Sequence, residues 1–265
     1  MKPPLSALFG CIAALVCTHE ADGVLVANPN PLNLPSSPPA NGAPWANVLL
    51  TNGGASSVYL GNGWVLTAEH VFDDIANPYV THNSINYLAN LANSYVLDNP
   101  ATFPGLGLTA KADLVLFKLV TEIPSLPTIP LGIASPSLPI TMIGFGGGKK
   151  WGTNTVESTS LENIDYSNPA DNDFVGFYSD YDTAVMSEAQ GTGGDSGGGA
   201  FAFQGLQWKL VGTMLAIDTV SDPDLTFFAD INTYAAQINS LIPEPSSLIL
   251  TAPALLLLLR RRRCK

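Results

Sequence analysis

One serine lies within a run of glycines in the second half of the chain. Residues 194–198 read Gly-Asp-Ser-Gly-Gly, so the hydroxyl of Ser196 is surrounded by residues that allow tight turns. Such turns can present backbone N–H groups to a carbonyl oxygen, which is the electrostatic support that acyl transfer needs. Linkers are also built from glycine and serine, but here the flanking segments are apolar. The run therefore predicts a nucleophilic serine.

A serine hydroxyl is a weak nucleophile unless a base removes its proton, and histidine is the usual base. Beyond residue 23 the chain has two histidines, His70 and His82. His70 follows Trp-Val-Leu-Thr-Ala-Glu, which predicts a strand and then one helical turn. His82 lies in a polar Thr-His-Asn segment and is predicted to be a solvated loop residue.

An aspartate, Asp113, opens the apolar run over residues 114–119. It can be a plain turn residue before a strand. It can also accept the second N–H of an imidazole, which fixes the tautomer of that ring and stabilises its protonated form. The chain thus offers a base, an orienting carboxylate and a nucleophile in the order His70, Asp113, Ser196.

Short apolar runs separated by Gly, Asn, Asp and Pro predict an all-β domain. The expected strands cover residues 48–50, 58–60, 64–67, 95–97, 114–119, 140–143, 174–178, 201–203 and 208–216. Residues 123–139 contain five prolines and are predicted to connect two β halves. Apolar residues at helical spacing predict a closing helix over residues 231–241.

The N-terminal part divides into two segments. Residues 1–23 are typical of a secretory signal peptide, with Lys2, an apolar run and small residues near the cut. A lipoprotein signal at Cys11 or Cys17 is the alternative. Residues 24–45 are rich in Pro and Asn and are predicted to be an extended leader, with the folded domain over residues 46–241.

The C-terminal residues 242–265 combine Pro-Glu-Pro, an apolar run and four arginines. As a helix, residues 246–259 would extend about 21 Å, which is less than a hydrocarbon core of about 30 Å. The pattern resembles the PEP-CTERM sorting tail of certain Gram-negative bacteria, which an exosortase-like enzyme is thought to recognise and cut. Membrane contact through this segment would then be transient, and a plain tail anchor is the alternative.

The composition excludes several classes. Cys11, Cys17 and Cys264 all lie in the end segments, so no disulfide is expected in the domain. The chain has a net charge of −11, and residues 24–242 contain only five lysines and no arginine, which disfavours nucleic acid as a partner. No metal-ligand cluster or phosphate-binding loop is evident, so no metal or cofactor is expected.

These features resemble the trypsin/chymotrypsin family. The resemblance rests on the order His70, Asp113, Ser196, on their flanking sequences and on Gly-Phe-Gly at residues 144–146. It covers about residues 46–241. It implies an all-β fold of two orthogonal antiparallel six-stranded barrels with a short C-terminal helix and the site between the barrels. It also implies His70 as general base, Asp113 as its orienter, Ser196 as nucleophile and the N–H groups of Gly194 and Ser196 as oxyanion hole.

The resemblance also places four substrate-binding residues. Gln190 would lie at the pocket floor, where an aspartate would select Lys or Arg. Ile217 and Thr226 would replace glycines of the pocket walls, which predicts cleavage after small aliphatic residues. Leu215 replaces the serine whose hydroxyl commonly supports the triad aspartate, while its backbone can still pair with substrate.

Activation is expected to differ from that of trypsin, because no Lys or Arg occurs between Lys2 and Lys111. In the family, Asp195 commonly pairs with a new N-terminus of the Ile-Val-Gly-Gly type, which this chain lacks. Asp195 must therefore have another partner, or a protease of different specificity must trim residues 24–45.

We expect a secreted serine endopeptidase that cleaves proteins or peptides by an acyl-enzyme mechanism. Export through the inner membrane would place it at the cell surface, in the extracellular matrix or in the periplasm. Two alternatives stay open, since a fold does not fix a function. One is a catalytically weak or inactive binding protein of the same fold, and the other is a structural component of an extracellular matrix.

Overall fold

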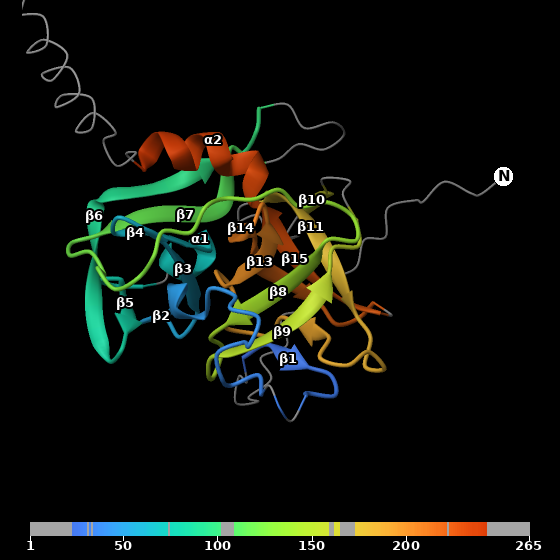
Figure 1. Ribbon diagram of the computed structural model, residues 1–265. Coiled ribbons are helices and arrows are strands. Elements are labelled where there is room, and N and C mark those ends of the chain that lie inside the picture. The colour runs from blue at the N-terminus through green and yellow to red at the C-terminus, as the bar shows by residue number, and fades with distance from the viewer. Residues whose placement is uncertain are drawn as a thin grey trace, which may run out of the picture.

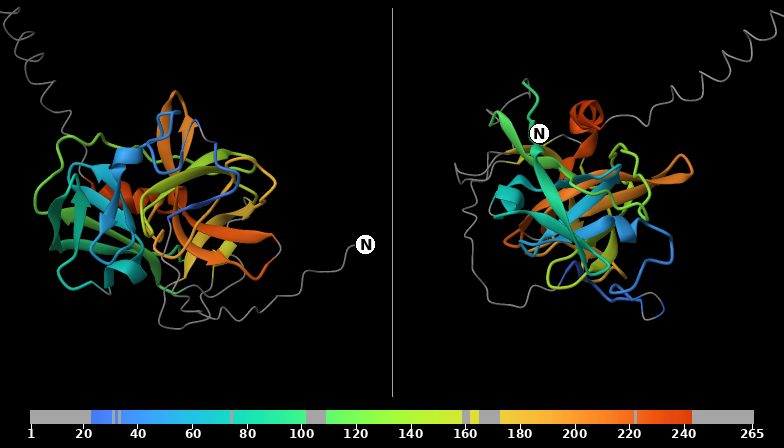
Figure 2. Two further views of the ribbon diagram at one scale, coloured as in Figure 1. Left: turned by 90° about the horizontal axis from the view of Figure 1, so that it is seen from below. Right: turned by 90° about the vertical axis from the view of Figure 1, so that its left-hand side faces the viewer.

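The computed structural model describes residues 23–30, 32, 34–73, 75–101, 109–158, 162–164, 173–221 and 223–242 (Figure 1). Two β bodies lie side by side, the first blue to green and the second yellow-green to orange (Figure 2). The predicted signal peptide, up to residue 22, and the sorting tail, from residue 243, lie outside the described residues. Within the described ranges, no helix has the length and hydropathy that a membrane span requires.

The first body is a closed antiparallel barrel with the strand order β2-β3-β4-β7-β6-β5. Its strands are β2 (Val48–Thr51), β3 (Ser56–Gly61), β4 (Trp64–Thr67), β5 (Tyr79–His82), β6 (Ile85–Asp98) and β7 (Lys111–Leu119). Strand β7 lies between β4 and β6, and nearly all of its side chains are buried. This burial on both faces explains why residues 114–119 form an almost continuous apolar run.

The second body is a seven-stranded antiparallel sheet with the order β10-β11-β15-β14-β13-β8-β9. Its strands are β8 (Pro139–Gly144), β9 (Lys150–Thr155), β10 (Glu162–Ile164), β11 (Phe174–Tyr181), β13 (Gly199–Gln204), β14 (Gln207–Asp218) and β15 (Asp224–Asp230). The all-β, chymotrypsin-like fold class is confirmed. The expectation of six strands is wrong for this body, which has one strand more.

The end strand β9 of the second sheet also contacts β11, near the other end, without a regular ladder. The backbone N–H of Glu157, just beyond β9, donates to Tyr178 O in β11 at 3.0 Å. The side chain of Asn154 in β9 donates to Asp180 O at 2.5 Å and to Ala189 O at 2.8 Å. Next to Asn154, Thr153 N donates to Ser187 O at 3.0 Å, so the edge of β9 also contacts the segment before β12 (Ala189–Gln190).

Residues 123–139 connect β7 to β8, as the prolines predicted. The predicted closing helix is also confirmed, as α2 (Ile231–Leu241). The carboxylate of Asp230 caps it by accepting from Asn232 N and Thr233 Oγ1. The side-chain amide of Gln237 forms hydrogen bonds with both the N–H and the C=O of Asp98 in β6. Helix α2, which follows the last strand of the second body, is therefore attached to the first barrel.

The segment before Trp45 is more firmly packed than expected. Strand β1 (Leu25–Val26) pairs with β12, and Val24 is fully buried. Further along, Trp151 in β9 donates its backbone N–H to Pro35 O at 3.0 Å. The prediction that the folded part begins near Trp45 is therefore wrong, because the short apolar segment at Val24 leads into β1, which forms a two-stranded sheet with β12.

Candidate active site

The structure joins His70 to Asp113 by two hydrogen bonds. His70 Nδ1 lies 2.8 Å from Asp113 Oδ2, and the backbone N–H of His70 donates to Asp113 Oδ1 at 2.9 Å. Asp113 is fully buried, whereas the His70 side chain is 32% exposed. A carboxylate on Nδ1 favours the tautomer that carries its proton there, which leaves Nε2 as a proton acceptor.

Local chain geometry brings these two residues together. His70 lies in α1 (Glu69–Asp73), a single helical turn that follows directly after β4. Asp113 lies near the start of β7, and β4 pairs with β7 in antiparallel register. The end of one strand therefore lies beside the beginning of the other, and one short helical turn lets the imidazole reach the carboxylate.

A buried polar cluster holds the segment around Asp113. The N–H of Asp113 donates to Asp173 O at 3.2 Å, and the side chain of Asn99 donates to the same carbonyl at 3.0 Å. Asn99 Oδ1 in turn accepts from the hydroxyl of Tyr234 in α2 at 2.8 Å. Burial raises the pKa of Tyr234 above its ordinary value, with smaller contributions from the charges of Asp230 and Asp113, so its hydroxyl keeps its proton and can donate.

Ser196 lies on the turn that precedes β13 and is attached to the first barrel. The backbone N–H of Ser56 in β3 donates to Ser196 O at 3.0 Å. Gly197 has a φ of +83°, and a Cβ there would collide with Ser56 O and Thr67 Oγ1. Thr67 ends β4, immediately before the helical turn of His70, so the glycine allows the serine turn to pack against the end of the strand that leads to His70.

The same turn leaves two backbone donors available. Gly194 has a φ of +90°, which only glycine adopts readily. Among the described residues, neither the N–H of Gly194 nor that of Ser196 donates to a protein acceptor. Two adjacent donors without a protein partner can bind an oxygen that carries developing negative charge.

Asp195 is buried beneath this turn, with 1% of its surface exposed. Its Oδ2 accepts from Thr192 N at 2.9 Å and its Oδ1 from Gly146 N at 3.1 Å, and a further bond comes from the backbone N–H of Val24. A Cβ at Gly144 would collide with this carboxylate, which explains the glycine there. Burial raises the pKa of Asp195 to about 6, although these donors act in the opposite direction. The expected alternative partner of Asp195 is thus a set of backbone N–H groups.

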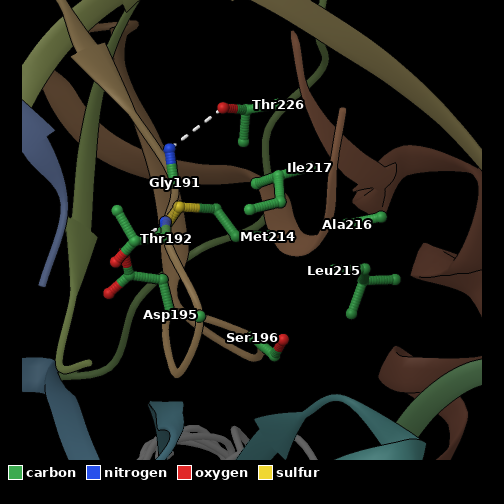
Figure 3. Close-up of a pocket in the computed structure, with 10 residues that line it drawn as sticks. Gly191, Thr192, Asp195, Ser196, Met214, Leu215, Ala216, Ile217 and Thr226 are labelled. Carbon is green, nitrogen blue, oxygen red and sulfur yellow. Dashed lines mark hydrogen bonds between the residues drawn. The ribbon is translucent and has the colours of Figure 1, made fainter. Parts of the chain in front are cut away.

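A cavity of about 70 Å³ adjoins Ser196 (Figure 3). Its lining includes the predicted pocket residues Leu215, Ile217 and Thr226. Thr226 Oγ1 accepts from Gly191 N at 3.0 Å, so this wall is tied to the strand before the serine turn. The small volume suits a short side chain.

Gln190 does not line this cavity, in contrast to the predicted place at its floor. It is 3% exposed and belongs to β12, where it pairs with Leu25. Met214, which the sequence analysis did not single out, lines the cavity next to Gly191 instead. In the sequence, Met214 lies in an apolar strand next to Leu215, so its residue type did not distinguish a pocket residue from a buried core residue.

The described residues contain no cluster of His, Cys, Asp and Glu that could hold a metal ion. The arrangement therefore consists of side chains and backbone donors: a histidine oriented by a buried carboxylate, a serine on a glycine turn, and two N–H groups. Placed between two β bodies, such a set defines the class of serine proteases with a chymotrypsin-like fold.

Comparison with known families identifies the chain within this class. Residues 35–238 match the family described as trypsin. The match covers most of the chain, and the protein belongs to the trypsin family. No curated protein sequence matches the chain closely enough to count as a relative.

Solved structures share the fold. The active form of the Rv3671c protease from M. tuberculosis has a TM-score of 0.54 and 16% identity, over 89% of this chain and 97% of that one. Its inactive form has a TM-score of 0.53 and 17% identity, over 83% and 100%. The MamO protease domain from Magnetospirillum magneticum has a TM-score of 0.52 and 20% identity, over 76% and 98%. Identities this low speak for the fold alone.

Asp195 is predicted to titrate near pH 6 in the folded, uncleaved protein, in which Val24 N is a neutral amide. Its folded pKa lies above the ordinary value near 3.9, so the native state binds more protons between these two pH values. Stability should therefore fall as the pH rises from about 4 to about 6, by about 3 kcal/mol in total. Carbon-13 NMR of the aspartate carboxyl carbons should show one signal with a midpoint near 6 that Asp195→Asn lacks. A protein in which every aspartate titrates below pH 5 would contradict this.

Proposed function

We propose that the protein is a serine endopeptidase in which His70, Asp113 and Ser196 form the catalytic triad. The observation that carries the proposal is the 2.8 Å contact between His70 Nδ1 and the buried carboxylate of Asp113. Family membership and the free donors of the serine turn support it.

In this mechanism the hydroxyl of Ser196 attacks the scissile carbonyl while His70 Nε2 takes its proton. The carbonyl oxygen becomes an oxyanion, which the N–H groups of Gly194 and Ser196 bind. The protonated His70 then gives its proton to the leaving amine, and an acyl-enzyme remains. Water, activated by His70, hydrolyses this ester and regenerates Ser196. Asp113 stays ionised and keeps the proton of His70 on Nδ1.

Covalent labelling tests the triad directly. A fluorophosphonate should label Ser196 of the unmodified protein, and Ser196→Ala should abolish labelling. Asp113→Asn should keep the fold but lower kcat by roughly four orders of magnitude, because the amide favours the wrong tautomer of His70. The matched control is Asp98→Asn, since Asp98 forms an exposed ion pair with Lys111. Equal labelling of the unmodified protein and Ser196→Ala would instead support the inactive binding protein.

Specificity is proposed to favour Ala or Val before the cleaved bond. The side chains of Met214, Ile217 and Thr226 converge on the small cavity in Figure 3, and the lining includes no basic residue and only Asp195 as an acid. Asp195 is engaged by backbone donors on its far side, so it offers no selection for Lys or Arg.

Chromogenic peptides that end in Ala, Val, Phe, Glu or Arg should give the highest kcat/KM for Ala or Val. Ile217→Ala should raise the ratio of kcat/KM for Phe over Ala by about tenfold, because it opens one wall. Ile133→Ala serves as the control, since Ile133 is 60% exposed and lies outside the cavity. A preference for Arg would refute this specificity.

We propose that removal of the signal peptide during export gives Asp195 a cationic partner. The predicted signal peptide ends at Gly23, and Val24 is the residue whose backbone N–H reaches Asp195. Cleavage between these residues would replace a neutral amide by an α-ammonium group with an ordinary pKa near 8. A cation beside the buried carboxylate would lower the pKa of Asp195 and remove its destabilising effect at neutral pH.

A protein that begins at Val24 should therefore be more stable at pH 7 than one that keeps the preceding residues, by about 1–3 kcal/mol. The α-amino group gains a partner, so its folded pKa rises, and the advantage should disappear above about pH 9. A protein that begins at Gly23 is the matched control and should gain nothing. Equal stability of all three would exclude this pairing.

Sorting by an exosortase-like enzyme, and the transient membrane contact that goes with it, stay predictions from residues 242–265. Mass spectrometry of the exported protein reads both ends at once. It should find Val24 at the N-terminus and loss of the arginine-rich end. Retention of the arginines would favour the plain tail anchor.

A further inference from the structure

A second cavity, of about 400 Å³, lies in the region of the first barrel and shares no lining residue with the cavity at Ser196. One wall comes from η1 (Trp45–Asn47) and β2, and another from the turn between β5 and β6. Phe145 and Lys149, from the segment between β8 and β9, complete it. The predicted solvated loop residue His82 in fact ends β5 and lines this cavity.

Lys149 is the cation of this cavity. Its Nζ donates to Val48 O at 2.6 Å and lies 4.6 Å from the centroid of the Trp45 ring and 5.5 Å from that of Phe145. An ammonium group has three N–H donors, and within the described part of the chain one of them has an oxygen acceptor. Among the described residues, Lys149 forms no ion pair with a carboxylate.

The hydrogen bond to Val48 O and the two aromatic rings stabilise this cation, but they supply no negative charge to balance it. Burial lowers the pKa of Lys149 to about 7, and no counter-charge opposes the shift. Across the cavity, burial and the charge of Lys149 lower the pKa of His82. The remaining lining residues, from η1, β2, the β5–β6 turn and Phe145, do not titrate. At pH 7 the cavity therefore holds two aromatic walls, a neutral imidazole and an amine that is charged in about half of the molecules.

We propose that this cavity binds a monocarboxylate with an apolar body. The carboxylate pairs with the ammonium group of Lys149, and the apolar body lies against Trp45 and Phe145. A single cation matches a single negative charge, and the apolar walls disfavour a polyanion such as phosphate. The carboxylate can come from a free carboxylic acid or from the C-terminus of a peptide. Binding does not depend on the proposed catalytic function.

Binding is linked to protonation, because the carboxylate pairs with the charged amine. The bound ligand raises the pKa of Lys149, so binding takes up a proton. Above about pH 7 the affinity falls about tenfold per pH unit until the pKa of the bound amine is reached. Protonation of His82 at lower pH adds a second positive charge and strengthens binding further.

Calorimetric titration with N-acetyl-leucine tests the proposal, with the neutral N-acetyl-leucinamide as matched ligand. The acid should bind at pH 6.5 at least tenfold more tightly than the amide. Lys149→Met should weaken binding of the acid at least tenfold. Lys118→Met should not, although Lys118 also lies over a tryptophan ring, at 5.8 Å from the Trp64 centroid and outside the cavity.

Three results would overturn the proposal: equal affinity for acid and amide, an unchanged affinity in Lys149→Met, or a loss in His70→Ala as large as in Lys149→Met. The last would put the ligand in the catalytic cleft. If Lys149→Met does not fold, carbon-13 NMR of Lys149 Cε in the unmodified protein decides. Its titration midpoint should rise by more than one pH unit with the acid and stay unchanged with the amide, and a constant midpoint with both rejects the site.

The two sources of the carboxylate are separated by the tripeptide Ala-Ala-Leu and its C-terminal amide. Tighter binding of the free tripeptide than of N-acetyl-leucine, with loss on amidation, assigns the cavity to peptide C-termini. Binding of N-acetyl-leucine without binding of the tripeptide assigns it to small free acids. Dissociation constants above about 10 mM for both acids would refute the proposal.

Discussion

The burial of one carboxylate, that of Asp195, constrains the arrangement around the serine. A charged group without solvent needs donors, and Asp195 obtains them from the backbone of Thr192, Gly146 and Val24. These donors lie on three separate segments, so satisfying one carboxylate draws together the serine turn, the end of β8 and the N-terminal strand. The sequence around each segment follows from this demand. Gly144 has no side chain because the carboxylate occupies that space.

A second buried carboxylate, that of Asp113, has different hydrogen-bond partners and a different role. Its oxygens accept from the ring and the backbone of His70, and its own N–H is tied to Asp173. Asp195 thus positions backbone segments, while Asp113 orients the imidazole of His70. The contacts of Asn99 and Tyr234 extend the support of Asp113 to α2, which explains why a helix outside both β bodies matters to the site.

Local chemistry in the sequence predicted the elements that carry strong patterns. The apolar run after Asp113 predicted a strand and lies in β7. The helical spacing of Ile231, Tyr234 and Ile238 predicted a helix, and these residues form the buried face of α2. Strands with mixed composition were missed. Residues 150–155 read Lys-Trp-Gly-Thr-Asn-Thr, which local propensity assigns to a turn, yet they form β9 because the partner strand β8 and the segment before β12 supply hydrogen bonds on both sides.

The candidate site was predictable where it depends on local sequence and less so where it depends on long-range packing. The glycine turn of Ser196 and the order of His70 and Asp113 could be named from residue types alone. The backbone partner Val24 of Asp195 could not, because nothing in the segment at residues 24–27 marks it as a neighbour of residues more than 150 positions away. The predicted place of Gln190 at the pocket floor was wrong for the same reason. Gln190 pairs with β1 and does not line the cavity, although its spacing from Ser196 suggested that it would.

The domain has no cysteine, and buried asparagines supply cross-links instead. Asn47, Asn99 and Asn154 are each less than a tenth exposed. Their side-chain amides donate to two, three and two carbonyls of distant segments. At about 0.5–1.5 kcal/mol for each bond, the set contributes about as much as one or two disulfides at about 2–4 kcal/mol each. A buried amide differs from a disulfide in being independent of redox state, so the fold that holds His70, Asp113 and Ser196 does not require an oxidising compartment.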